Sequence, residues 1–178
     1  MRRVLLLFVV FSLVFSISSC IKRGEEDPFL SIYKRETRLV KNWKLKYLQS
    51  QIFSKDSSGI GYVNIRELNK GSYVESTGVD TATKTVRGTI YATLLIDADG
   101  SYTFTEDKVL GSKTTTNKIS GKWSWDDKVK KGQLIFTNWK TFDVTGLWDE
   151  KLILSINEEN TFPNGATYSS FERWQFEI

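Results

Sequence analysis

The sequence predicts an all-β protein, and three observations support that prediction. From Trp43 onward, apolar and polar residues alternate over short runs, which is the period of a half-buried strand. Asp99-Gly100 joins two such runs and is typical of a tight hairpin turn, because glycine adopts positive φ without strain and aspartate tolerates it. The composition has many Thr, Val, Ile, Trp and Phe residues and only 2 prolines, which favours strands over helices.

Length and charge narrow the function classes. The 178 residues, 40% of them hydrophobic, are enough for one well-packed domain. The net charge is +4, from 25 basic and 21 acidic residues. Arg2 and Arg3 lie in a leader that we expect to be removed, which leaves 23 minus 21, or +2. We therefore expect no nucleic-acid partner.

The histidine and cysteine counts narrow the chemistry. The chain has no histidine and one cysteine. This excludes histidine-based catalysis, histidine metal sites, Cys–His dyads and intrachain disulfides. We expect no metal and no cofactor.

Residues 1–19 have the pattern of a secretion signal. Arg2 and Arg3 are followed by an apolar run, Val4 to Ile17, that is shorter than the roughly 20 residues of a membrane-spanning helix. The run ends in Ile17-Ser18-Ser19-Cys20, which resembles the lipobox of bacterial lipoproteins. The resemblance implies that Cys20 becomes the N-terminus and carries acyl chains such as palmitate. Each buried CH2 of these chains contributes roughly 0.8 kcal/mol to membrane anchoring.

The sequence of residues 20–28 predicts a charged tether between this anchor and the β domain of residues 29–178. Glu25, Glu26 and Asp27 resemble the acidic export signals of Bacteroidetes surface lipoproteins, and a plain solvated tether is the alternative. The predicted location is the outer membrane of a bacterial envelope. The sequence does not decide between its periplasmic face and its surface face.

Within residues 29–178 we expect a short helix and then about eight strands. Phe29 to Val40 can form the helix, with Ser31 as its N-cap. Weaker patterns between residues 60 and 80 indicate one or two further strands. We expect loops at 54–59, 78–84, 108–117 and 158–167, where polar residues or turn formers cluster. Short strands at regular intervals predict an antiparallel meander that forms a barrel or a sandwich.

Three segments carry a resemblance to the lipocalin-like putative lipoproteins of Bacteroidetes. These are residues 39–45, with Trp43 in the first strand; residues 99–104 followed by 121–125; and residues 142–147 followed by 151–154. The resemblance implies a lipocalin-like barrel and a ligand cavity inside it. It implies no common activity.

Aromatic side chains in the inward phase of the predicted strands are the candidate ligand site. Such rings either fill a small barrel as its core or line a cup that holds one small ligand. In this interpretation Trp43, Leu45 and Tyr47 share one face of the first strand. The candidate cavity wall is formed by Tyr47, Phe104, Trp123, Trp125, Phe136 and Trp174.

The function that follows is a non-catalytic binding module, anchored through Cys20, for a small apolar, lipid or glycan ligand. The alternative is an envelope interaction or scaffold lipoprotein with a closed core and a protein partner. A hydrolase with a carboxylate or Ser–Lys site is a third hypothesis. Asp97-Ala98-Asp99-Gly100 begins like a calcium loop, but its glycine is fourth rather than sixth, so we predict a hairpin turn.

Overall fold

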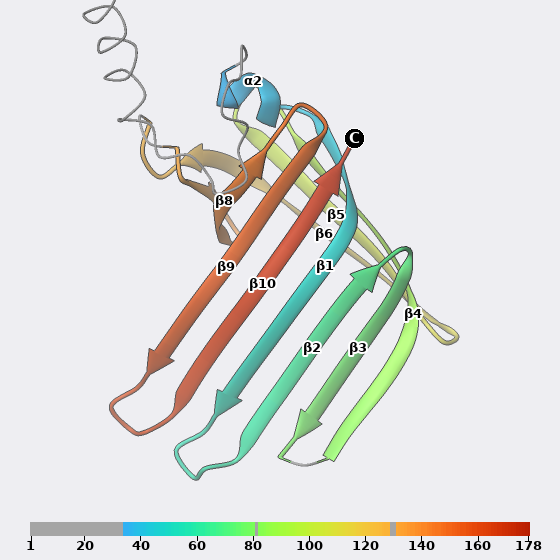
Figure 1. Ribbon diagram of the computed structural model, residues 1–178, viewed down its shortest axis with the longest axis vertical. Helices are drawn as coiled ribbons and strands as arrows, with labels where there is room; N and C mark the ends of the chain where they lie inside the picture. The colour runs from blue at the N-terminus through green and yellow to red at the C-terminus, as the bar shows by residue number, and fades with distance from the viewer. Residues whose placement is uncertain (1–33, 81, 129–130) are drawn as a thin grey trace, which may run out of the picture.

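The computed structural model describes residues 34–80, 82–128 and 131–178. They form a closed antiparallel barrel of ten strands with one short helix (Figure 1). The signal segment, Cys20, the tether and the first part of the predicted helix lie outside the described residues. The elements are α2 (Arg35–Leu39), β1 (Asn42–Lys55), β2 (Gly61–Asn69), β3 (Ser72–Val79), β4 (Ala82–Ile96), β5 (Ser101–Leu110), β6 (Lys113–Trp125), β7 (Gln133–Phe136), β8 (Thr141–Leu147), β9 (Lys151–Thr161) and β10 (Thr167–Glu177).

The prediction of about eight strands was too low, and β2 and β3 account for the difference. At its beginning β1 pairs directly with β4, through Asn42 with Leu95 and Lys44 with Thr93. Beyond these pairs the β2–β3 hairpin lies between β1 and β4 and pairs with both. The weak pattern between residues 60 and 80 therefore corresponds to two full strands.

Three predicted loops are largely strand. β3 and β4 leave only residues 80 and 81 between them, and β5 and β6 are separated by Gly111 and Ser112 alone. The loop expected at 158–167 shrinks to residues 162–166. These strand ends are mostly exposed, so the alternation that reveals a half-buried strand is weak there.

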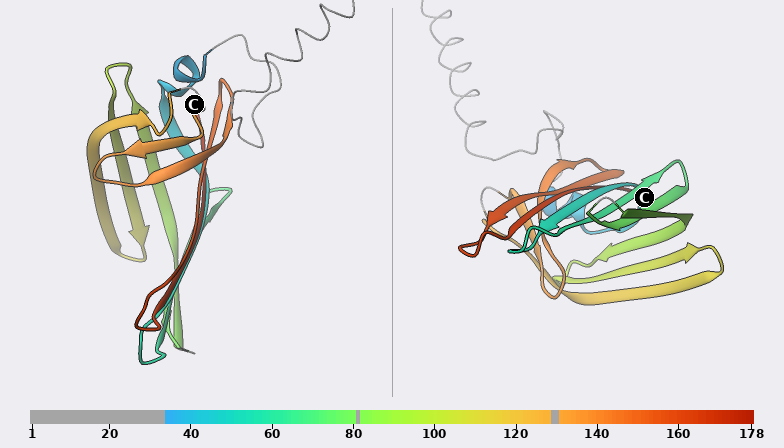
Figure 2. Two further views of the ribbon diagram at one scale, coloured as in Figure 1. Left: turned by 90° about the vertical axis from the view of Figure 1, so that its left-hand side faces the viewer. Right: turned by 90° about the horizontal axis from the view of Figure 1, so that it is seen from below.

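The barrel has two layers near α2 and one layer at its other end. β9, β10, β1, β2, β3 and β4 continue as a single sheet beyond β5 to β8, as Figure 2 shows from the side. Gly88 marks the point on β4 where pairing with β5 ends. A Cβ at Gly88 would lie 1.8 Å from the carbonyl oxygen of Val109, so only glycine allows this close approach.

A β-bulge in β1 reverses the predicted orientation of Tyr47. Trp43 and Leu45 are buried, as the alternation predicts. The register against β10 shifts between Leu45 and Tyr47, and the buried position after the shift is Leu48. Tyr47 therefore points away from the core, and its hydroxyl donates to Gln49 Oε1 at 3.2 Å. The prediction that Tyr47 faces inward with Trp43 was wrong.

Aromatic rings fill the barrel between its two layers. Their centre is Trp139, which lies in the turn between β7 and β8 rather than on a strand. Its ring centroid lies 4.4 Å from Phe104, 5.0 Å from Phe142, 5.4 Å from Phe136, 5.9 Å from Trp174 and 6.2 Å from Tyr102.

Helix α2 covers the two-layered end. Leu39 is buried in the core, and its carbonyl accepts a hydrogen bond from Trp43 Nε1 at 2.8 Å. Arg38 is buried and donates to the carbonyl of Leu147. The guanidinium of Arg35 lies 5.3 Å from the ring centroid of Trp125. This end of the barrel is therefore closed by side chains from α2.

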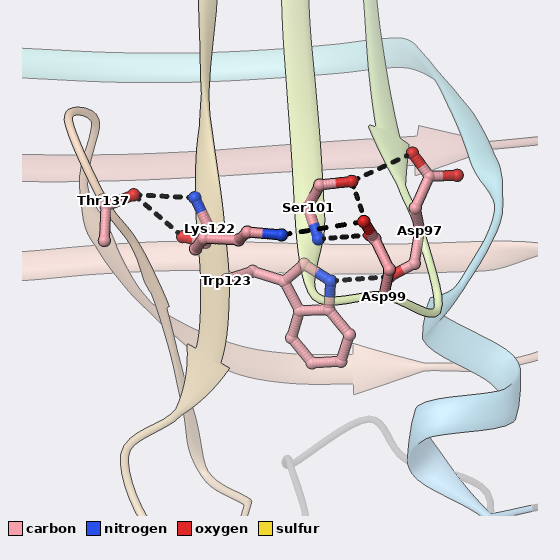
Figure 3. Close-up of polar contacts among 6 residues, drawn as sticks. All are labelled: Asp97, Asp99, Ser101, Lys122, Trp123 and Thr137. Atoms are coloured by element: carbon pink, nitrogen blue, oxygen red, sulfur yellow. Dashed lines mark hydrogen bonds and ion pairs between the residues drawn. The ribbon is translucent and has the colours of Figure 1, made fainter.

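Asp97 to Gly100 form the predicted hairpin turn between β4 and β5 (Figure 3). Gly100 has φ +83°, and Asp99 Oδ1 accepts hydrogen bonds from Ser101 N at 2.8 Å and Ser101 Oγ at 2.6 Å. These bonds hold the pKa of Asp99 below its ordinary value. The turn also fixes Trp123, whose Nε1 donates to the Asp97 carbonyl at 2.9 Å.

The first prediction concerns Trp139. Trp139→Ala should lower the free energy of unfolding by about 2–3 kcal/mol, because the ring contacts several core aromatics although it is only partly buried. Trp148→Ala is the matched control, since Trp148 lies outside the core cluster. Chemical denaturation measures both variants. Equal losses in the two variants would contradict the central position of Trp139.

Candidate functional site

The candidate site lies on the inner face of the long sheet, the face that turns toward β5 to β8. Cross-strand pairing arranges the inner side chains in rows that run from β9 through β10, β1, β2 and β3 to β4. We name four of these rows, in order from the core outward along the sheet. The core row consists of Leu154, Trp174, Leu48, Leu68, Tyr73 and Gly88, and the next, the charged row, consists of Ile156, Glu172, Ser50, Arg66, Glu75 and Val86. The polar row follows with Glu158, Ser170, Ile52, Asn64, Thr77 and Lys84, and the tyrosine row comes last with Asn160, Tyr168, Ser54, Tyr62, Val79 and Ala82.

Glu172 is the most buried carboxylate of the charged row, with 1% of the residue exposed. It forms an ion pair with Lys140, which lies in the turn between β7 and β8, just before β8 begins. Trp174 Nε1 donates to Glu172 Oε2 at 3.0 Å, and an Arg66 nitrogen lies 3.7 Å from the same oxygen. The Arg66 guanidinium also lies 5.6 Å from the Trp174 ring centroid. The carboxylate is thus tied both to cations and to the aromatic core.

Glu75 is the second carboxylate of the charged row. Lys108 on β5 donates to Glu75 Oε2 at 2.9 Å, so this pair crosses from one layer to the other. The hydroxyl of Tyr73 lies 3.4 Å from the same oxygen. Burial, with the negative charge of Glu75 next in size, raises the pKa of Tyr73 well above its ordinary value. Tyr73 therefore stays neutral and can donate.

Polar atoms beside these ion pairs are buried without partners. Within the described ranges, Ser50 Oγ, Asn64 Oδ1 and Ser170 Oγ make no hydrogen bond. Asn64 and Ser170 belong to the polar row and lie on either side of Ile52. Ser50 belongs to the neighbouring charged row. A buried polar group without a partner costs roughly 1–3 kcal/mol, so these three oxygens make this part of the interior less stable than a fully paired one.

A groove of about 710 Å³ lies over the polar and tyrosine rows. Its volume falls within the range of small-molecule sites. It lies on the single-layered part of the sheet, where β5 to β8 do not cover the inner face (Figure 2). It is lined by Ile52, Ser54, Tyr62, Val63, Asn64, Thr77, Gly78, Val79, Ala82, Thr83 and Lys84.

The structure separates the predicted cavity wall from this groove. Phe104, Phe136 and Trp174 come together as core, each with 3% or less of its surface exposed. Trp123 and Trp125 are half-buried against the same core, at the end near α2. Tyr47 lies on the outer side of β1. None of these predicted residues lines the groove.

Sequence reasoning missed the buried carboxylates, although the alternation of residues along their strands places them on the inward face. Glu172 stands in the same alternation as Trp174 and Phe176, and Glu106 in that of Tyr102 and Phe104. Both glutamates are buried. A carboxylate at an inward position of an apolar strand face is the signal that identifies them.

Comparisons with known proteins add no relative. No family model, curated protein or solved structure matches the chain. In the part of the chain that the structure describes, no helix is long and apolar enough to cross a membrane.

The second prediction tests the charged row. Lys140→Met should lower the free energy of unfolding by roughly 1–3 kcal/mol, because it deprives a buried carboxylate of a charged hydrogen bond. Lys122→Met is the control, since its partner Asp99 is exposed, and it should cost at most about 1 kcal/mol. In a double-mutant cycle with Glu172→Gln, the effects of Lys140→Met and Glu172→Gln should be non-additive. Additive effects would contradict the coupling.

Proposed function

We propose that this protein is a lipid-anchored bacterial envelope lipoprotein whose barrel is a non-catalytic binding module for a small ligand. The ligand occupies the groove over the polar and tyrosine rows. Acyl chains on Cys20 hold the protein in the outer membrane.

One observation carries the binding proposal: the groove of about 710 Å³ on the inner face is lined by polar side chains beside an exposed tyrosine. Asn64, Ser54 and Thr77 belong to its wall, and Tyr62 is 45% exposed. Small-molecule sites combine apolar surface with a few polar groups in this way. A ligand with hydrogen-bonding groups would contact the polar side chains of the wall.

The filled core argues against a ligand at the aromatic wall expected from the sequence. Phe104 and Trp139 stack at 4.4 Å between centroids, and Trp174 packs edge-on against both. Rings at these separations occupy the interior themselves. The groove supports binding at the opposite part of the inner face instead.

The arrangement of the chain also supports an anchored binding module. α2 follows the segment that contains Cys20, and it lies at the two-layered end of the barrel (Figure 1). The groove lies toward the single-layered end. A membrane anchor before α2 would leave the groove accessible from the side away from the bilayer.

The pairing of charges supports a non-catalytic function. Glu172 is held by Lys140 and Arg66, and Glu75 by Lys108. Carboxylates fixed in this way hold one geometry rather than stand ready to exchange protons with a substrate.

A protein partner remains the second candidate, and the outer face of the single layer favours it. Phe53 is 44% exposed and Phe171 39% exposed, and Val63 pairs with Phe53 on the same face. Exposed apolar side chains in one patch are typical of interaction surfaces. This alternative makes the protein an envelope scaffold with a closed core.

The anchor is tested by Cys20→Ala. The wild-type chain should incorporate radiolabelled palmitate and enter the detergent phase, whereas Cys20→Ala should do neither because the thiol that receives the diacylglycerol is gone. Ser18→Ala keeps a small residue before the cysteine and should behave as wild type. Palmitate incorporation by Cys20→Ala would refute the lipoprotein proposal.

Binding is tested by native mass spectrometry of the lipidated protein, gently extracted from the membranes of its own cells. A small-mass adduct beyond the acyl anchor is expected, and Asn64→Leu should lose it because the groove wall loses its acceptor. Asn69→Leu, at the other end of β2, should keep it. A second protein in place of the adduct would favour the scaffold.

A further inference from the structure

We propose that the groove binds an uncharged carbohydrate, an inference that rests on the proposed binding function and specifies its ligand class. The groove has three features that together suit a sugar and suit a fatty acyl chain or a charged metabolite less well. These features are a lining with one charged side chain, hydrogen-bonding side chains in the groove wall, and an exposed tyrosine ring.

Charge balance favours a neutral ligand. In the charged row above the groove, two carboxylates, Glu172 and Glu75, meet three cations, and each carboxylate is already engaged. Glu106, buried on β5, adds a third negative charge facing Tyr73. Among the residues that line the groove, Lys84 is the charged one, and Glu158 stands outside the lining at the other end of the polar row. A charged ligand would therefore find no cluster of the opposite sign.

The polar side chains of the groove wall favour a ligand that both donates and accepts hydrogen bonds. The Asn64 amide can do both, and Ser54 and Thr77 add hydroxyl groups to the same wall. Sugar hydroxyl groups have the same dual capacity. An acyl chain would offer none of these side chains a hydrogen bond.

One tyrosine, Tyr62, lines the groove in the tyrosine row. It pairs with Ser54 on β1, a small residue of the same lining. Tyr62 is 45% exposed although it belongs to the inner face. A tyrosine ring offers an apolar face with a polar tip, which can cover the C–H face of a sugar while the hydroxyl group contacts water or ligand.

The site is also a surface on a single-layered sheet rather than an enclosed cup. A long alkyl chain gains affinity from complete removal from water, and here β5 to β8 do not extend over the groove (Figure 2). A sugar ring, with polar groups around its edge, tolerates partial exposure. The same openness allows a glycan to extend past the groove at either side.

The test is a binding screen of the full lipidated protein in detergent micelles. The probes are neutral oligosaccharides of glucose, mannose, galactose, xylose and N-acetylglucosamine, and calorimetry then measures Kd for the best binder. We expect binding in the micromolar to millimolar range. Tyr62→Ala and Asn64→Leu should each weaken it by about tenfold or more.

Matched controls separate the site from general damage. Tyr91→Ala removes an exposed strand tyrosine outside the groove, with 71% of the residue exposed, and Asn69→Leu repeats the Asn64 change at the other end of β2. Both should bind as wild type. Thermal unfolding checks that every variant is folded; a glycan whose Kd is the same in folded Tyr62→Ala and Asn64→Leu protein would overturn the assignment.

The outcomes also distinguish this inference from the proposed function. If no neutral oligosaccharide binds but the native protein carries a lipid adduct that Asn64→Leu loses, the binding function stands and the carbohydrate inference fails. Selective binding of acidic oligosaccharides would overturn the neutral class alone. If no adduct is present and no oligosaccharide binds, both proposals fail.

Discussion

The packing of Trp139 against its neighbouring rings determines how the rest of the barrel can be used. Because Trp139 enters from a turn, it reaches the space between the two layers that strand residues alone would leave open. The two-layered end therefore becomes a solid core, covered by α2. The groove over the polar and tyrosine rows lies farther along the long sheet, where the second layer ends.

The charged row forms the boundary between these two regions. On one side, Trp174 and Tyr73 belong to the core and also contact the carboxylates of Glu172 and Glu75. On the other side, Asn64 and Thr77 belong to the wall of the groove. Ion pairs at this depth are costly to desolvate and contribute little net stability, so their value is to fix one geometry at the boundary. A ligand would meet a rigid floor.

Much of the fold could be predicted from the sequence, because alternation and turn chemistry are local signals. They located the central strands and the Asp97–Gly100 hairpin. They failed where strands leave the core, since exposed strands such as the beginning of β6 have no apolar face to reveal them. The β-bulge that turns Tyr47 outward depends on pairing with β10, which the order of residues does not show. The groove was missed because it joins residues of β1 to β4 that share no motif, and Trp139 because a turn residue has no strand phase.

The length of β1 makes the resistance of the molecule to force depend on direction. Its 14 residues run from the end covered by α2 to the groove, about 45 Å at roughly 3.3 Å per residue, with β10 on one side and β4 or β2 on the other. Hydrogen bonds between antiparallel strands lie perpendicular to this axis. A load applied along the sheet would strain many of these bonds in shear at once, instead of opening them one after another. The long sheet therefore resists a pull along its length better than a pull across it.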